Sequence, residues 1–192
     1  MKLDEIVLSG AAPRLLLHCC CAPCASYVLE YLSPFFAITA LFYNPNIMPR
    51  EEHDKRAGEL GKLLSRTEYP NRVGLVSAQH DPSGFLQAAM PLRDEPEGGL
   101  RCRACYEIRL EETARRAAAS GFDCFATTLS VSPHKDAQLL NEIGERLAGL
   151  YGCEYLVSDF KKRDGFRRSV ELSKRYGLYR QSYCGCDMAL NA

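Results

Sequence analysis

Short apolar runs alternate with amphipathic segments along most of the 192-residue chain, and this alternation constrains the fold more than any other feature. The predicted strands are Leu15–His18, Ala37–Tyr43, Val73–Ser77, Cys124–Leu129 and Glu154–Val157. The predicted helices are Pro23–Leu32, Arg50–Ser65, Cys102–Ser120, Lys135–Leu150 and Gly165–Arg175. Strands that alternate with helices favour an α/β fold, with a mainly parallel sheet and helices on both faces.

Composition and charge exclude several classes of protein. The chain has 24 Lys+Arg and 24 Asp+Glu, so its formal net charge is zero and any nucleic-acid contact must use a local patch. Leu15–Leu29 is the most apolar stretch, but cysteines, a histidine and a proline interrupt it. Asp4 and Glu5 precede this stretch, where a signal peptide would be basic. Without repeats or a linker, we expect one cytoplasmic domain over residues 1–192 that does not insert into a membrane.

The ten cysteines are unevenly placed, because eight of them lie within three residues of another cysteine. The clustered ones are Cys19, Cys20, Cys21, Cys24, Cys102, Cys105, Cys184 and Cys186. Cys124 and Cys153 stand alone beside apolar residues, where a thiol usually acts as a small hydrophobic side chain. In a chain without an export signal, such clusters indicate metal binding or redox chemistry rather than structural disulfides.

Two cysteine pairs can supply thiolate ligands to one centre, and we name Cys20, Cys21, Cys102 and Cys105 the cysteine quartet. Cys20 and Cys21 can face one centre only where the backbone turns, as expected between the first strand and its helix. Cys102 and Cys105 open a predicted helix and lie on one face of it, where the helix dipole favours thiolate. Four cysteines serve either a structural zinc ion or a four-iron, four-sulfur (4Fe-4S) cluster. Cys24 is a spare ligand, a ligand of a second metal, or a buried thiol.

Cys184-Gly185-Cys186 has a different spacing and predicts a different role. With one intervening residue the two cysteines would close a small ring, whose disulfide would be strained and readily reduced. Gly185 has no Cβ to hinder such a tight loop. We interpret the pair as a dithiol that carries two electrons, with a further metal-ligand pair as the alternative.

A basic segment, residues 161–180, holds eight Lys and Arg against two Asp and Glu, which favours a local phosphate-binding face. The candidate RNA contacts in this segment are Lys161, Lys162, Arg163, Arg167, Arg168 and Arg180. Tyr176, Tyr179 and Tyr183 lie among or beside them and are candidates for stacking on exposed bases or for packing. No glycine-rich phosphate loop appears in the sequence, so ATP-dependent activation is disfavoured.

Five segments follow one another in an order and spacing that are more specific than any single cysteine pair. They read LLLHCCCAPCA, FYNPNIMP, CRACYEIRLEETA, FATTLSVSPHKD and LYRQSYCGC. From Leu15 to Cys186 they resemble the QueH-type epoxyqueuosine reductases. The resemblance implies a Rossmann-like fold of the adenine nucleotide alpha hydrolase type. It also implies a cobalamin-independent oxidoreductase that converts epoxyqueuosine at the wobble position of tRNA to queuosine, the last step of queuosine biosynthesis.

The resemblance further implies roles for individual residues. The cysteine quartet would hold a 4Fe-4S cluster, and Cys184 with Cys186 would be the redox-active pair. An additional iron near the cluster would use Cys24 and Asp159. The candidate proton donors are Tyr43, Tyr183 and Asp159. The expected partners are the anticodon loop of tRNA and an unidentified electron donor.

Three alternatives remain open. An iron–sulfur tRNA thiolation enzyme would share the fold and the substrate but would need an ATP-binding loop. A zinc-stabilised RNA-binding module would use the cysteine quartet only as a structural site. A thiol–disulfide oxidoreductase would need only Cys184 and Cys186.

Overall fold

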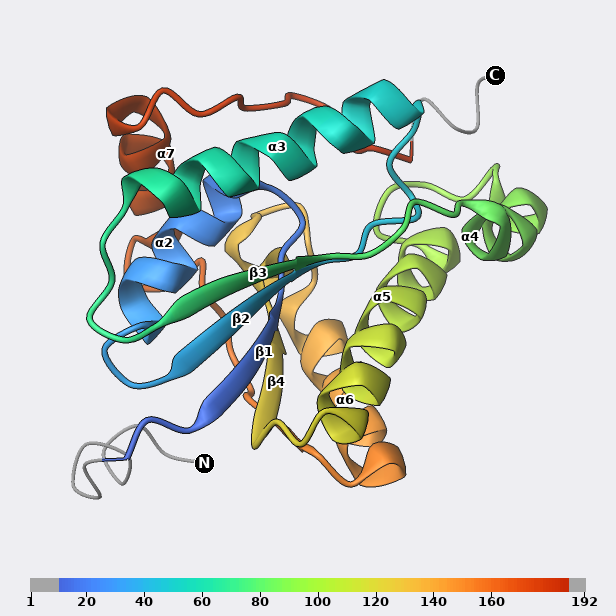
Figure 1. Ribbon diagram of the computed structural model, residues 1–192. Coiled ribbons are helices and arrows are strands. Elements are labelled where there is room, and N and C mark those ends of the chain that lie inside the picture. The colour runs from blue at the N-terminus through green and yellow to red at the C-terminus, as the bar shows by residue number, and fades with distance from the viewer. Residues whose placement is uncertain (1–10, 187–192) are drawn as a thin grey trace.

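Five parallel strands form one sheet in the order β3-β2-β1-β4-β5 in the computed structural model, which describes residues 11–186 (Figure 1). The strands are β1 Arg14–His18, β2 Ala37–Phe42, β3 Val73–Ser77, β4 Cys124–Thr127 and β5 Glu154–Tyr155. All four pairings between neighbouring strands are parallel, as the alternation of strands and helices predicts. The predicted α/β fold is therefore confirmed.

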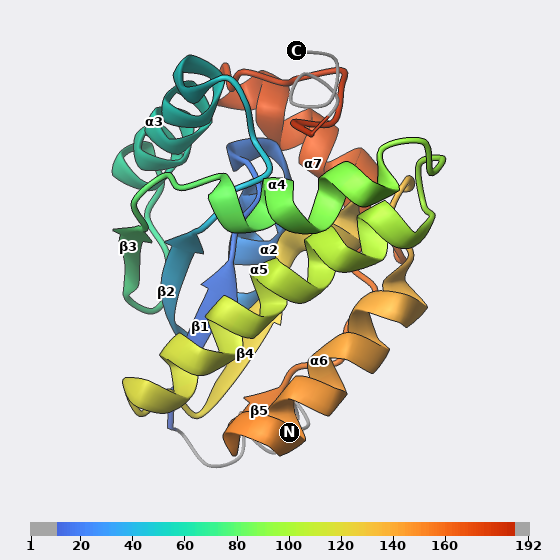
Figure 2. The same ribbon diagram turned by 90° about the vertical axis from the view of Figure 1, so that its right-hand side faces the viewer.

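Helices cover both faces of this sheet. The α-helices are α2 Ala22–Leu32, α3 Arg50–Arg66, α4 Ser83–Ala89, α5 Leu100–Ala119, α6 Ala137–Tyr151 and α7 Gly165–Arg175. Two short 3-10 turns are η1 Met90–Leu92 and η2 Thr128–Val131. Figure 2 looks onto the face that α4, α5 and α6 cover, while α2, α3 and α7 lie on the other side. Within residues 11–186, no helix is both long and apolar enough to cross a membrane.

Strand β1 shows why the sheet is buried on both sides. Leu15 and Leu17 are fully buried among residues of α2 and α3, whereas Leu16 packs into the opposite cluster with α5 and α6. Successive side chains of a strand point to opposite faces, so an uninterrupted apolar run suits a central strand covered twice. The apolar run in the sequence therefore corresponds to the middle of the sheet.

Several predicted element boundaries differ from the structure, and in two of them a single side chain gives the local reason. The strand predicted to reach Leu129 ends at Thr127, because the Thr127 side chain accepts a hydrogen bond from the Leu129 N–H and begins η2. The helix predicted from Lys135 begins at Ala137, because Asp136 accepts hydrogen bonds from two N–H groups of the first turn. Lys135 therefore lies outside the helix.

The sheet reverses its winding direction between β1 and β4. The chain runs from β1 to β2 and β3 on one side, then returns to place β4 and β5 on the other side of β1. In open parallel sheets, ligands bind beyond the carboxyl ends of the strands at such a reversal. The segments after β1 and β4 are therefore the first place to look for a site.

Candidate metal and redox centre

The cysteine turn after β1 lies at this reversal point. The Cys20 N–H donates a 3.2 Å hydrogen bond to the hydroxyl of Thr128, which directly follows β4. Asn44, which follows β2, donates through Nδ2 to the carbonyl of Cys19 at 2.9 Å. Three strand ends are thus joined around the first cysteines.

Three thiols gather at this turn. The sulfur atoms of Cys20, Cys21 and Cys24 all lie within 4.8 Å of one another, and those of Cys20 and Cys21 are 3.7 Å apart. Helix α2 starts at Ala22 with Pro23 in its first turn, so the backbone bends between Cys20 and Cys24. Three convergent thiols of this kind can bind a metal ion.

The three thiols differ in their ionisation. Hydrogen bonds from Cys21 and Cys24, together with the positive charge of Arg109, hold the pKa of Cys20 well below its usual range in spite of burial. The hydrogen bond to Cys20 is the main reason that the pKa of Cys21 rises to about 12. The same interaction, followed by that with Cys21, raises the pKa of Cys24. In the absence of a metal ion, the thiolate of Cys20 is therefore stabilised by the thiols of Cys21 and Cys24.

The other four predicted site cysteines meet around a small cavity. Cys102 and Cys105 lie in the first turns of α5, and they line the cavity together with Cys184 and Cys186. The sulfur atoms of Cys184 and Cys186 are 3.3 Å apart. The structure therefore brings half of the cysteine quartet next to Cys184 and Cys186, and the other half next to Cys24.

Arg109 of α5 joins the two groups of cysteines. Its side chain is 4% exposed, and its Nη1 lies 3.7 Å from Sγ of Cys105. Nε donates to Nε2 of His18 at 3.3 Å, and Nη2 donates to Oδ1 of Asn44 at 2.6 Å. Although burial opposes the charge, the thiols of Cys105 and Cys20 raise the pKa of Arg109. A buried guanidinium in contact with a thiol suits a site that carries negative charge.

His18 is a structural histidine of the core. Burial and the charge of Arg109 lower its pKa to about 3, so the ring is neutral. Its Nδ1 forms a 2.8 Å hydrogen bond with the hydroxyl of Thr127. With both ring nitrogens engaged, His18 orients Arg109 and is not in the group of three thiols.

The Cys184–Cys186 loop packs against the segment that follows β2. The Met48 N–H donates a 3.3 Å hydrogen bond to the carbonyl of Gly185. A Cβ on Gly185 would lie 2.8 Å from Cγ1 and 3.0 Å from Cα of Ile47, closer than side chains tolerate. Glycine at this position is therefore required for the loop to approach Ile47, in addition to the tight spacing that the sequence shows.

Four further residues line the cavity and were not predicted from the sequence: Phe85, Arg101, Tyr106 and Lys135. Lys135 lies 2.9 Å through Nζ from Oε1 of Glu97, and its side chain is mostly buried. Tyr106 is 2% exposed, and its hydroxyl has no hydrogen-bond partner within residues 11–186. The only sequence signal was the position of Lys135 next to Asp136, a residue type that often caps a helix.

The three predicted proton donors lie elsewhere. The Asp159 carboxylate is 3.0 Å from Nζ of Lys161 and 3.7 Å from Nζ of Lys162. Burial and the charge of Glu112 raise the pKa of Tyr43. The Tyr183 hydroxyl is 3.4 Å from that of Tyr179. None of the three side chains is among those that line the cysteine cavity.

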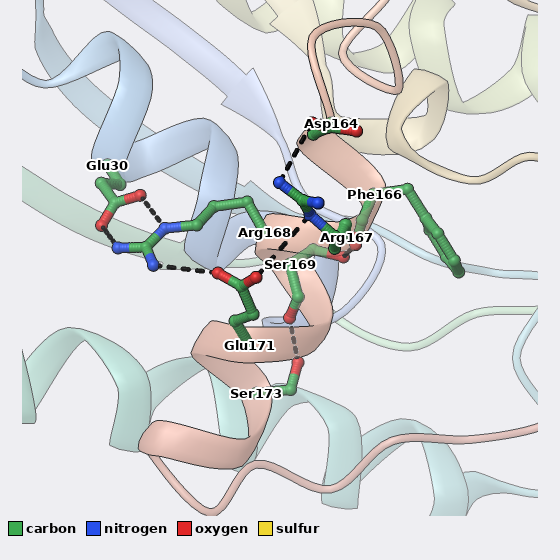
Figure 3. Close-up of polar contacts among 8 residues, drawn as sticks. All are labelled: Glu30, Asp164, Phe166, Arg167, Arg168, Ser169, Glu171 and Ser173. Atoms are coloured by element: carbon green, nitrogen blue, oxygen red, sulfur yellow. Dashed lines mark hydrogen bonds and ion pairs between the residues drawn. The ribbon is translucent and has the colours of Figure 1, made fainter.

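Four of the eight cations of the basic segment have acidic partners among residues 11–186. Arg168 contacts Glu30 of α2 at 2.7 Å and Glu171 at 3.2 Å (Figure 3). Arg167 lies 3.1 Å from Asp164, and Lys161 and Lys162 share Asp159. Among the six predicted RNA contacts, Arg163 and Arg180 form no ion pair with residues 11–186. The local positive charge is thus smaller than the count of basic residues suggests.

Comparison with known proteins identifies the family. A family profile described as epoxyqueuosine reductase QueH matches residues 15–192. The chain belongs to the epoxyqueuosine reductase QueH family. The QueH protein of Streptococcus pyogenes serotype M1 is 45% identical over 179 residues, which cover 92% of this chain and 70% of that protein.

Other QueH proteins give the same result. The protein from Staphylococcus epidermidis is 42% identical over 186 residues, covering 94% of this chain and 77% of the relative. The protein from Thermotoga maritima is 34% identical over 179 residues, covering 92% and 90%. Each of these QueH relatives carries the name epoxyqueuosine reductase, so the family is one of tRNA-modifying oxidoreductases.

Proposed function

We propose that this chain reduces epoxyqueuosine at the wobble position of tRNA to queuosine, using a 4Fe-4S cluster and a redox-active cysteine pair. The observation that carries the proposal is the cavity where Cys184 and Cys186 lie beside Cys102 and Cys105. A dithiol next to two proposed cluster ligands is the arrangement that a two-electron reduction needs.

The cysteine quartet would hold the cluster. The donor atoms are all sulfur, as such clusters require, and the buried charge of Arg109 lies between Cys105 and Cys20. An anionic thiolate centre would compensate that charge, which burial otherwise makes unfavourable. When bound, the cluster would supply electrons one at a time. We propose Cys24 as a ligand of one additional iron. Asp159 could be a second ligand only after breaking its ion pairs with Lys161 and Lys162.

The dithiol of Cys184 and Cys186 can supply the electrons that reduction of the epoxide consumes. Conversion of an epoxide to an alkene removes the oxygen as water and consumes two electrons and two protons. Oxidation of Cys184 and Cys186 to a disulfide releases two electrons and two protons, so the dithiol alone balances the reaction. Return of the disulfide to the dithiol then consumes two protons and two electrons from a reductant outside the chain, and the cluster, when bound, would serve to pass these electrons on one at a time. Lys135 and Arg109 place positive charge at the cavity, where it would stabilise the oxygen as it becomes negative.

Arg163 and Arg180 are the members of the basic segment that we expect to contact tRNA phosphates directly. The other four predicted contacts would have to exchange an acidic partner for a phosphate. The ion pairs of Arg167 and Arg168 are exposed, and such pairs contribute little to stability, so their exchange costs little free energy.

One observation favours a different metal content. The group of Cys20, Cys21 and Cys24 has the short separations that a single tetrahedral ion requires, and zinc would be the natural occupant. In that case this group of three thiols would be a structural zinc site rather than part of a cluster.

Metal and sulfide analysis of anaerobically purified protein separates the two proposals. About four irons and four acid-labile sulfides per chain would support the reductase. One zinc without sulfide would exclude it. In the reductase, Cys184→Ser and Cys186→Ser should keep the iron and lose conversion of epoxyqueuosine in tRNA. Cys153→Ser, at a buried thiol outside the cavity, is the matched control and should retain both.

A further inference from the structure

Tyr183, the residue before Cys184, carries an aromatic ring that is held on two sides. On one face, the guanidinium carbon of Arg56 lies 5.4 Å from the ring centroid. At the edge, the hydroxyl of Tyr183 is 3.4 Å from the hydroxyl of Tyr179, which donates to Glu52 at 3.2 Å. Tyr183 nevertheless remains 37% exposed, so a planar ligand can reach the ring.

The support behind this ring is rigid. Arg56 is 4% exposed, and its Nε donates a 2.7 Å hydrogen bond to Oε1 of Glu52, one turn earlier in α3. The same carboxylate accepts from Tyr179, so both sides of the Tyr183 ring depend on one buried acid. A ring fixed in advance loses little conformational entropy when a ligand stacks on it.

Two cations of the neighbouring segments have no acidic partner among residues 11–186: Lys55, beside Tyr179, and Arg180, three residues before Tyr183 in the chain. Lys55 is exposed, and its Nζ lies 3.5 Å from the ring centroid of Tyr179. Arg180 is exposed and lies 5.2 Å from the ring of Phe166. Neither cation forms an ion pair with a carboxylate in residues 11–186, in contrast to Arg168 in Figure 3. Both therefore remain available to an external anion.

We propose that Tyr183 is the platform on which an unpaired base of an RNA loop stacks beside Cys184, while Lys55 and Arg180 contact the neighbouring phosphates. An aromatic face flanked by cations is the combination with which proteins hold single-stranded RNA. Because Tyr183 directly precedes Cys184, a base on this ring is held next to the redox pair. The inference rests on the proposed function and specifies how the tRNA loop is positioned.

Binding of an unmodified anticodon stem-loop RNA to the anaerobically purified full-length protein tests the platform. Tyr183→Leu removes the aromatic face and should weaken binding about 10- to 100-fold. Tyr183→Phe keeps the face and should bind within about threefold of the wild type. Phe122→Leu is the matched control, because the Phe122 ring also has a cation beside it, with the guanidinium carbon of Arg14 4.6 Å from its centroid, but it lies just before β4, away from the platform. It should bind as the wild type does.

A second readout reports stacking directly. The chain contains no tryptophan, so Tyr183→Trp introduces a single reporter at the platform. RNA binding should quench its fluorescence, and affinity should equal or exceed that of the wild type. Unchanged fluorescence in the bound complex, or wild-type affinity of Tyr183→Leu, would overturn the inference. Equal weakening by Phe122→Leu would also overturn it, because the effect would then not be specific to the Tyr183 ring.

The platform and the redox chemistry can fail separately. Cys184→Ser should bind the stem-loop with wild-type affinity and show no turnover. If the wild type does not convert epoxyqueuosine in tRNA, the proposed function is wrong, and if Cys184→Ser still converts it, the redox role of Cys184 is wrong. In both cases the binding results continue to test the platform. If Tyr183→Leu binds normally and the enzyme turns over, only the platform is wrong.

Discussion

Nη2 of Arg109 donates a 2.6 Å hydrogen bond to Oδ1 of Asn44, and this bond ties helix α5 to the segment that follows strand β2. The same guanidinium reaches Cys105 and His18, so one buried side chain connects three parts of the site. Its removal would leave several buried polar groups without a partner.

Arg109→Met should therefore lower the free energy of unfolding of the metal-free protein by about 2–4 kcal/mol, since buried unpaired groups cost about 1–3 kcal/mol each. Urea denaturation measures the change. Arg103→Met, on the same helix with a side chain 54% exposed, is the control and should have little effect. Equal stability of the two variants would contradict the role of Arg109.

Alanine at any position of the cysteine quartet should abolish the iron and the brown colour of the anaerobic protein, because each thiolate supplies one of four bonds to the proposed cluster. Cys24→Ala should keep the cluster and lose only additional iron. Cys153→Ala is the control. Full iron content in two of the four quartet variants would refute the assignment.

Gly185→Ala should lower turnover at least tenfold with iron content unchanged, because the new Cβ would lie 2.8 Å from Cγ1 of Ile47 and displace the redox loop. Anaerobic turnover and iron analysis on the same preparation test this. Gly58→Ala in α3 has open space around the added Cβ, so it should keep full activity. Normal turnover of Gly185→Ala would show that the loop does not need this contact.

Glu59 should make stability depend on pH. Lys62 and the backbone N–H of Tyr179 donate hydrogen bonds to its carboxylate and lower its pKa below the ordinary value of 4.5. The stabilisation is therefore complete above about pH 4.5 and is lost as the pH falls through the lower folded-state pKa. Glu59→Gln should show a shallower loss of stability below about pH 5 than the wild type. Glu51→Gln, exposed on the same helix, should not change the slope.

The architecture was predictable because its determinants are local in the sequence. Uninterrupted apolar runs predict the central strands, because their side chains are buried on both faces of the sheet. The helices between the strands predict that the strands pair in parallel. Boundaries were less predictable where one side chain decides them. The side chains of Thr127 and Asp136 each accept a hydrogen bond from the N–H group two residues later, and the periodicity of apolar residues does not predict such a bond.

The site was only partly predictable, because its polar contacts join distant segments. The cysteine spacing indicates which thiols act in pairs, but Arg109 meets Asn44 and His18 across 65 and 91 residues of sequence. The ion pair of Arg168 with Glu30 spans 138 residues, so a count of charges within one segment overstates the free charge. The sequence predicts that a helix begins at Lys135, whereas the cap at Asp136 places Lys135 before the helix.

The position of the loop of residues 93–99 has a practical consequence for assembly of the centre. Strands β1, β2 and β3 precede this largely exposed loop, and β4 and β5 follow it. A chain divided after Glu95 would leave Cys20 and Cys21 in one fragment and Cys102 and Cys105 in the other. Neither fragment alone would carry the whole cysteine quartet. If the two fragments bind iron only after they are mixed, the iron content measures how far the fragments have reassembled the fold.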